Sequence, residues 1–466
     1  MNKRKLVFKY LTFDIIASLV IWVLFMVFRK TVNDAQVFGS IQVFVPNYDF
    51  FSSLLLFPLS CIFVHYLTGF YLQSYKKSLT NVIFTTFFAS IIISVSIFFV
   101  LMLDDIVLSY QYYYYSLLVL LGLSFFITLI SRLFIWTEVR NNFKTKKWKI
   151  NTLIIGTGEN ALRITRDIEA KSQQNNIIGF ITVDNIMRVN KDRVLGNMSN
   201  IDALISENSI EEAIILLDNP DEQKLFKYIN TLFKYNIDIR FTPRLYEILT
   251  GSARMGAIGI NPLVTITNVN MSDWEISLKR FFDIVISFLS LVFLSPVFVY
   301  FAIFIKRDSK GPVFYKQERI GLLGKPFDIL KFRTMHQGAE NGVPKLSNAN
   351  DDRVTNIGKV LRKYRIDELP QFWNVLKGEM SLVGPRPERK FYINQIIELA
   401  PYYCLLYKIR PGLTSWGPIK IGYSDTLEKM IERLNYDVIY MENMTLLNDL
   451  KILILTFEII FKGKGV

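Results

Sequence analysis

Four long apolar runs in the first third of the chain constrain its fold more than any other feature. The runs cover Leu6–Phe28, Tyr48–Leu72, Val82–Leu103 and Tyr112–Ile135. Each is close to the ~20 residues that a helix needs to cross a bilayer. We therefore expect residues 1–140 to form a four-helix transmembrane bundle, which serves as an anchor or a dimerisation element. We also expect no charged residue in the middle of a span.

Basic residues set the predicted orientation of this bundle. Lys3 and Arg4 precede the first run, Lys76 and Lys77 join the second to the third, and a further basic cluster follows the fourth. Because such residues collect on the cytoplasmic side, both ends of the bundle should face the cytoplasm. With these apolar runs, the net charge of +13 favours an anionic membrane surface over nucleic acid as the partner. Two cysteines and two histidines are too few for a disulfide framework or a zinc cluster.

Residues 149–243 change to an alternating pattern that predicts a Rossmann-like α/β domain. A first strand near Thr152 runs into Gly156-Thr-Gly158-Glu-Asn-Ala161, which is typical of a glycine turn before a helix. The other predicted elements are strands at Ile177–Val183, Glu212–Leu217 and Ile237–Thr242, and a helix at Leu225–Tyr235. The glycines with Asp184 match a dinucleotide fingerprint, but a lone motif of this kind is weak evidence for a cofactor. Residues 244–274 should form a connector.

A fifth apolar segment, Phe281–Ile305, has basic residues at both ends. Positive flanks suit a segment that enters and leaves on one membrane face. Ser295-Pro296 lies near its middle, where proline breaks a helix and the serine hydroxyl can satisfy a freed carbonyl. We therefore predict a re-entrant helix over 279–306. A kinked spanning helix is the alternative, and it would place the rest of the chain outside the cell.

Residues 350–388 carry the candidate chemistry. Asp367 and Glu368 are adjacent, and the same short span contains Arg353, Arg362, Arg365 and Arg386. Apolar spacing predicts a helix up to the acidic pair, Pro370 breaks it, and Gly378 should end the next helix. One carboxylate can then act as a nucleophile towards phosphorus while the other, Glu368, holds Mg²⁺. The alternative is a solvated helix end with ordinary surface ion pairs.

Basic residues elsewhere in this region have two interpretations. We expect Lys331, Arg333 and Arg353, with Arg362 and Arg386, to bind phosphate through charge-assisted hydrogen bonds. Lys316 and Arg319 fit contact with anionic lipid. Residues 336–350 should form a polar loop, and Tyr436–Phe461 a helix lying in the membrane interface.

The motifs of residues 275–466 resemble the bacterial sugar transferase family, the polyprenyl-phosphate glycosyl-1-phosphate transferases. The matching residues are Arg362, Asp367-Glu-Leu-Pro-Gln371, Asn374-Val-Leu-Lys-Gly378 and Met380-Ser-Leu-Val-Gly-Pro-Arg-Pro-Glu388. The whole chain is similar to the long form of that family, with its membrane bundle and regulatory or scaffolding middle domain. Ser415 and Pro418 stand where the family has glycine and glutamine, which puts the contacts to the donor's base and sugar in doubt.

The resemblance implies an activity and a location. A multi-domain membrane protein of this kind transfers a sugar 1-phosphate from a UDP-sugar to polyprenyl (undecaprenyl) phosphate through a covalent intermediate on Asp367, and releases UMP. Its mainly α-helical catalytic domain, 275–466, would contact lipids at the cytoplasmic face of a bacterial inner membrane, as a homodimer, with Mg²⁺ as cofactor.

Two functions of other classes stay open. A membrane-anchored nucleotide-sugar dehydratase or epimerase would share the layout of spans followed by a Rossmann-like domain, although no Tyr-x-x-x-Lys pair occurs in the chain. A non-enzymatic scaffold for polysaccharide assembly is disfavoured by the density of acids and arginines at 350–388.

Overall fold

The structure is a computed structural model, and it forms two compact units, residues 1–149 with 272–279 and residues 150–271 with 280–466. It describes residues 3–33, 48–104, 110–172, 174–183, 186–218, 221–242, 263–266, 271–339, 351–422 and 426–461. Asp184 and most of the loop 336–350 lie outside the described residues.

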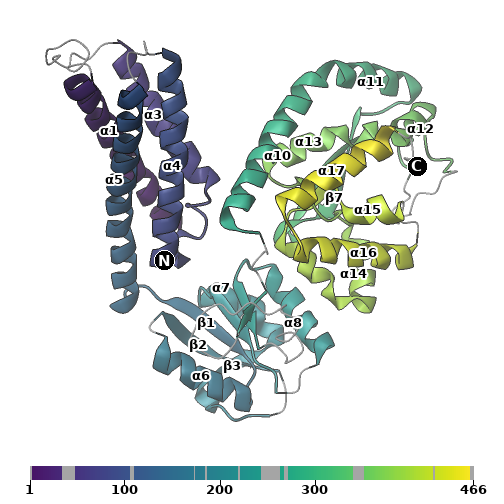
Figure 1. Cartoon of the computed structure of the whole chain (residues 1–466). Coiled ribbons are helices and arrows are strands. Elements are labelled where there is room, and N and C mark those ends of the chain that lie inside the picture. The colour runs from purple at the N-terminus through teal and green to yellow at the C-terminus, as the bar shows by residue number, and fades with distance from the viewer. Residues whose placement is uncertain are drawn as a thin grey trace. The chain divides into compact units, whose positions relative to one another are not determined.

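The first unit is a helical bundle, as the sequence predicts. Its helices are α1 (Lys3–Phe28), α3 (Tyr48–Leu67), α4 (Leu79–Asp104) and α5 (Tyr110–Lys144), with short helical turns at Arg29–Asn33 and Ser74–Lys76 (Figure 1). All four are long and apolar enough to cross a membrane. Trp22, Phe25, Phe57 and Leu120 are buried between them, while many other apolar side chains face outwards, as expected of helices in lipid.

A buried ion pair lies inside this bundle, so the expectation of no charge within a span is wrong. Arg132 of α5 binds Asp14 of α1 through two hydrogen bonds of 3.1 and 2.9 Å, and both residues are at most 1% exposed. Tyr71 donates to the same carboxylate at 2.8 Å, Arg132 donates to Thr86 at 2.9 Å, and the guanidinium lies 3.6 Å from the centre of the Phe70 ring. Charges are tolerated at this depth because each satisfies the other.

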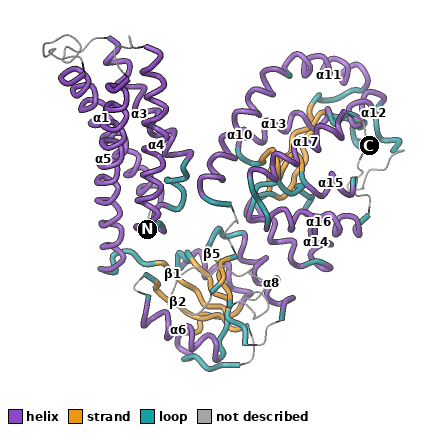
Figure 2. The backbone as a smooth tube through the Cα atoms, viewed as in Figure 1, coloured by secondary structure: helices purple, strands orange, loops and turns teal. Residues whose placement is uncertain are grey.

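The middle of the chain forms a six-stranded sheet in the order β3-β2-β1-β4-β5-β6, which confirms the Rossmann-like α/β prediction (Figure 2). Its strands are β1 (Ile150–Ile155), β2 (Asn175–Thr182), β3 (Val194–Asn197), β4 (Glu212–Ile215), β5 (Asp238–Phe241) and β6 (Val264–Thr265). Its helices are α6 (Glu159–Lys171), α7 (Ile201–Glu207) and α8 (Glu222–Phe233), with 3-10 turns at Lys191–Arg193 and Met198–Asn200. The first five strands are parallel and β6 is antiparallel to β5.

Apolar side chains are buried on both faces of this sheet. Leu153 and Ile155 belong to one apolar cluster and Ile154 to another, because successive side chains of a strand point to opposite faces. Strand β6 lies within residues 244–274, so part of the predicted connector belongs to the sheet.

The C-terminal part is mainly helical around two small sheets. Its helices are α10 (Asp273–Phe293), α11 (Ser295–Asp308), α12 (Asn356–Lys363), η6 (Ile366–Gln371), α13 (Phe372–Lys377), α14 (Lys390–Leu399), η7 (Pro401–Lys408), α15 (Trp416–Ile421), α16 (Leu427–Glu442) and α17 (Leu446–Phe461), with η5 (Leu322–Gly324) between strands. Strands β7 (Phe314–Ile320) and β8 (Pro326–Phe332) form an antiparallel hairpin, and β9 (Ser381–Val383) pairs in parallel with β10 (Gly412–Thr414).

Helices α10 and α11 meet at a bend of 59°. Pro296 lies in the first turn of α11, and the Ser295 hydroxyl donates to the carbonyl of Val292 at 2.7 Å. The break therefore falls at the predicted Ser-Pro. Phe293, beside the bend, is 75% exposed, as a side chain immersed in lipid would be. The bend suits a re-entrant hairpin and a broken span alike, and the re-entrant topology stays a prediction.

The stretch Tyr436–Phe461 is two helices rather than one. Helix α16 ends at Glu442 and α17 begins at Leu446. Asp449 of α17 accepts a 2.6 Å hydrogen bond from Tyr440 of α16, so this acid is an internal partner and does not face water. Helix α16 lines the candidate site described below.

Candidate active site

The acidic pair lies on a short 3-10 helix between two α-helices. Helix α12 ends at Lys363, and Arg365 then adopts a left-handed conformation with φ of 56°, which redirects the chain into η6. Helix α13 follows Pro370 and is ended by Gly378, whose φ is 86°. The predicted end of α13 at Gly378 is therefore present, but the break lies at Arg365, before Asp367 and Glu368, and not at Pro370, because η6 contains Pro370 and runs directly into α13.

Glu368 is held by three cations. Its carboxylate lies 2.8 Å from Lys331 Nζ, 3.1 Å from Arg386 Nη2 and 3.5 Å from Arg365 Nη1. Burial alone would raise the pKa of Glu368, but these charges together hold that pKa well below its usual range. Glu368 is therefore ionised in this arrangement.

The pKa of Asp367 is shifted in the opposite direction from that of Glu368. Burial and the neighbouring charge of Glu368 raise its pKa to about 6, against the attraction of Lys331, Arg362 and Arg365. Within the described residues it forms no direct ion pair. Two adjacent carboxylates with pKa values moved apart are a recurring feature of sites where the two groups have different tasks.

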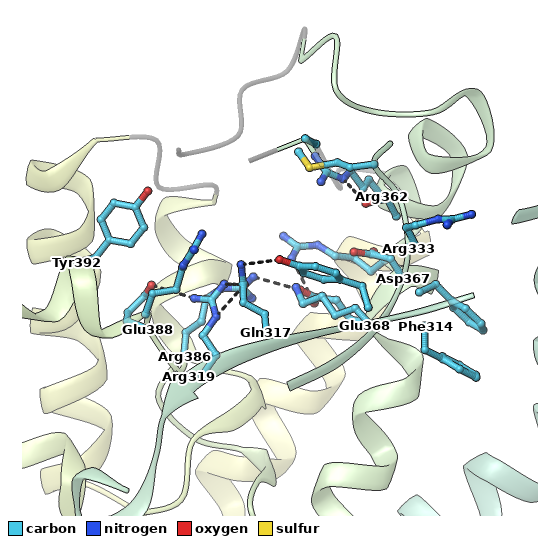
Figure 3. Close-up of a pocket in the computed structure, with 18 of the residues that line it drawn as sticks. Phe314, Gln317, Arg319, Arg333, Arg362, Asp367, Glu368, Arg386, Glu388 and Tyr392 are labelled. Atoms are coloured by element: carbon cyan, nitrogen blue, oxygen red, sulfur yellow. Dashed lines mark hydrogen bonds and ion pairs between the residues drawn. The ribbon is translucent and has the colours of Figure 1, made fainter. Parts of the chain in front are cut away.

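Both carboxylates line a pocket of about 500 Å³. Figure 3 shows the pair between Arg362 on one side and Arg386 and Arg319 on the other, with Tyr392 at the far end. A cavity of this size accepts a small organic ligand, and its guanidinium groups suit a ligand with phosphate.

A second acidic group lies at the Arg386 end of the pocket. Glu388 forms ion pairs with Arg433 of α16 and with Arg319 of β7, the latter at 3.4 Å. Arg319 also donates to the carbonyl of Pro387 at 3.1 Å. Arg319 is thus part of the site, and its predicted contact with lipid is wrong because the side chain is turned into the pocket.

Helix α16 contributes residues that sequence reasoning missed. Arg433 lines the pocket, and Asp437, one turn later, accepts the backbone N–H of Arg386 at 3.3 Å. Burial raises the pKa of Asp437 to about 6. The available signal was the spacing of a basic and an acidic residue at i and i+4 on one face of an amphipathic helix.

The remaining predicted phosphate ligands divide into two groups. Lys331, Arg362 and Arg386 line the pocket with the acidic pair, and Arg362 also donates to the Thr334 hydroxyl at 3.0 Å. Arg353 instead forms a two-point contact with Asp351, at 2.7 and 2.6 Å, and is not among the lining residues.

Arg333 lines the pocket, but its guanidinium is used elsewhere. It donates to the carbonyls of Lys310 at 2.9 Å and Ser309 at 2.7 Å, where α11 ends, and its side chain extends away from the acidic pair in Figure 3. Arg333 therefore ties the residues that follow α11 to the end of β8, and its contact with phosphate stays a prediction.

Magnesium fits this pair of carboxylates only together with a phosphate ligand. No three His, Cys, Asp or Glu side chains gather as a metal cluster within the described residues. Mg²⁺ is commonly held by one or two carboxylates, with substrate phosphate and water as the other ligands. Glu368 would supply one such carboxylate, so an ion arriving with a diphosphate suits the site.

The glycine turn of the middle domain is filled by a carboxylate of the chain itself. Asp218 accepts the N–H groups of Glu159 at 3.1 Å and Asn160 at 2.9 Å, at the start of α6. A Cβ on Gly158 would lie 1.3 Å from the Asp218 carboxylate. These are the donors that a cofactor pyrophosphate would need. The turn therefore does not fit a dinucleotide or coenzyme A phosphate while Asp218 is in place.

Comparison with known proteins yields two family matches. Residues 274–463 match the model of the bacterial sugar transferase, and residues 66–243 match that of a CoA-binding domain. The second match would lead one to expect coenzyme A in the middle domain, but the hydrogen bonds of Asp218 at the start of α6 do not support such binding.

Several characterised proteins are similar to this chain. A UDP-glucose:undecaprenyl-phosphate glucose-1-phosphate transferase of Klebsiella pneumoniae is 34% identical, over 58% of this chain and 57% of its own length. A UDP-N-acetylgalactosamine-undecaprenyl-phosphate N-acetylgalactosaminephosphotransferase of Aeromonas hydrophila is 35% identical, over 49% of this chain and 54% of its own length. A second UDP-glucose:undecaprenyl-phosphate glucose-1-phosphate transferase, from Caulobacter vibrioides, is 41% identical over 38% of this chain and 67% of its own length. The chain thus matches little more than half the length of the first two.

Proposed function

The chain belongs to the bacterial sugar transferase family, and we propose on this premise that it transfers a sugar 1-phosphate from a UDP-sugar to undecaprenyl phosphate, with release of UMP. The observation that carries the proposal is the acidic pair in a cation-lined pocket, where Asp367 and Glu368 have opposite electrostatic characters. Relatives with this activity use UDP-glucose or UDP-N-acetylgalactosamine. The glycosyl group that this chain transfers is left to experiment.

The first step is attack by an Asp367 oxygen on the phosphorus that bears the sugar. A bond forms between the carboxylate and that phosphorus, the bond to the oxygen of the uridine-side phosphate breaks, and UMP leaves with the electron pair. Asp367 suits this role better than Glu368, because its higher pKa makes it the more basic oxygen, whereas three cations occupy Glu368.

The second step regenerates the enzyme. An oxygen of the lipid phosphate attacks the same phosphorus, the new diphosphate bond forms, and the carboxylate of Asp367 leaves. Lys331, Arg362 and Arg386, which line the pocket, would bind the phosphate oxygens in both steps and offset charge on them. When bound by Glu368, Mg²⁺ would supply further charge neutralisation between an anionic nucleophile and an anionic diphosphate.

The location of the reaction completes the proposal. Residues 279–306 enter and leave on the cytoplasmic face of a bacterial inner membrane, which keeps the pocket beside the nucleotide sugars of the cytoplasm. The positive flanks, the 59° bend and the exposed apolar residues around it support this topology. The homodimer that the family implies belongs to the same proposal.

Purified full-length protein, incubated with undecaprenyl phosphate, Mg²⁺ and a panel of UDP-sugars, tests the proposal by the release of UMP. We expect release with at least one sugar, dependent on the lipid for multiple turnovers, and loss of release in Asp367→Asn. Conversion of the UDP-sugar to a 4-keto or epimerised product without UMP would favour the dehydratase or epimerase. No turnover with any sugar would refute the transferase.

A further inference from the structure

We infer that Asp437 of α16 is a positioning residue that fixes Arg386 in the active site. The inference rests on the proposed function, because Arg386 matters to the reaction only if the pocket binds a phosphate-bearing donor. Nothing in the sequence motifs marks Asp437, which lies 49 residues beyond Glu388.

The backbone around Arg386 has a single hydrogen-bond donor. Arg386 lies between Pro385 and Pro387, and proline has no N–H. The N–H of Arg386 is therefore the only backbone donor of the three residues, and Asp437 accepts it at 3.3 Å. Asp437 is 2% exposed, so no bulk water competes for this contact.

The carbonyls of the two prolines are also fixed. The carbonyl of Pro385 accepts the N–H of Gly412 at 2.9 Å, and that of Pro387 accepts from Arg319 at 3.1 Å. The Pro-Arg-Pro segment is thus held at three backbone points from three parts of the chain. Of these, the Asp437 contact acts on Arg386 itself.

The Arg386 side chain connects the Asp437 contact to the acidic pair. Its Nη2 lies 3.1 Å from Glu368, so a shift of the Arg386 backbone would displace one of the three cations on that carboxylate. Arg433, one turn before Asp437, binds Glu388, two residues after Arg386. One face of α16 therefore holds both ends of the segment that carries Arg386.

The Asp437 carboxylate has three neighbours besides the backbone N–H of Arg386. The Ser415 side chain and the backbone N–H of Gly417 also approach the carboxylate, and Arg433 is the charged group that acts on it. None of these three belongs to the acidic pair or to its direct ion pairs. If Asp437 were only a packing element, its loss would not interact energetically with Arg386.

A double-mutant cycle in the full-length protein separates these roles. The variants are Asp437→Ala, Arg386→Ala and the double variant, with Asp437→Asn as the conservative change and Glu432→Ala as the control, because Glu432 is an exposed acid on the same helix. UMP release with undecaprenyl phosphate gives kcat and the donor KM, and thermal unfolding gives stability. The Arg386→Ala variant keeps its backbone N–H, so the cycle reports the side chain that Asp437 positions.

We expect Asp437→Ala to lower kcat/KM by about ten- to a hundredfold, the range for a lost hydrogen bond to a charged group. Asp437→Asn, whose amide oxygen can still accept, should stay within about threefold of the wild type. The double variant should be no slower than Arg386→Ala, because the effect of Asp437 passes through Arg386. Glu432→Ala should match the wild type.

Additive losses in the double variant, or a loss in Asp437→Asn as large as in Asp437→Ala, would overturn the inference. If Asp437→Ala does not fold, Asp437→Asn alone decides: a folded but inactive amide variant contradicts the positioning role, and an active one supports it. Failure of the proposed function would show separately, since the wild type would then release no UMP.

Discussion

The ionisation of Asp367 makes the first half of the proposed reaction depend on pH in a defined direction. Its pKa is raised from 3.8 to about 6, first by burial and then by the charge of Glu368. A carboxylic acid with a raised pKa attacks only above that value, so the rate should increase with pH through about 6 and become constant above it. At pH 5 about a tenth of the groups are ionised, which predicts about a tenth of the rate at pH 8.

The assay is the single burst of UMP released when enzyme and UDP-sugar are mixed without lipid. Leaving out undecaprenyl phosphate matters because a phosphate monoester itself titrates near pH 6. Arg362 lowers the pKa of Asp367, so Arg362→Gln should move the midpoint to higher pH. Lys363→Gln removes an equal charge from an exposed neighbouring position and should leave the midpoint in place. A profile that is flat from pH 4.5 to 8, or a midpoint near 4, would refute the reasoning.

Three other predictions follow from the same contacts. Glu368→Gln should raise the Mg²⁺ concentration needed for half-maximal UMP release by about tenfold or more, and an unchanged magnesium titration would remove Glu368 as a ligand. The wild type should bind neither NAD⁺ nor coenzyme A in a calorimetric titration, because Asp218 fills the anion position at α6; tight binding of either would contradict this. Cysteines placed at Lys279 and Lys310 should both react with an impermeant maleimide from the cytoplasmic side, with little background from the two buried native cysteines, whereas labelling from opposite sides would rule out the re-entrant topology.

The parts of the fold that could be predicted are those set by local patterns. The length of the apolar runs was enough to locate the four spans. The alternation of strand and helix patterns in the middle domain located most strands of the sheet. Gly378 acts within its own turn, so the end of α13 could also be placed from sequence, whereas the left-handed residue before the acidic pair, Arg365, could not.

What could not be predicted depends on partners that are distant in the chain. Asp14 and Arg132 are 118 residues apart, so hydropathy along one span cannot reveal that they neutralise each other. Arg333 had carbonyls and phosphates as equally suitable partners from sequence, and the carbonyls it binds belong to residues that follow α11. Asp437 reaches Arg386 across 51 residues, which no local pattern encodes.

The covalent intermediate on Asp367 is the central claim, and direct trapping tests it. Full-length protein is mixed with UDP-glucose or UDP-N-acetylgalactosamine carrying ³²P in the sugar-bearing phosphate, without lipid, then quenched and digested for mass spectrometry. The account predicts label on the peptide that contains Asp367, one UMP released for each labelled chain, discharge by undecaprenyl phosphate, and no label in Asp367→Asn. UMP that appears only when lipid is present, with turnover but no labelled protein at any time, would contradict it.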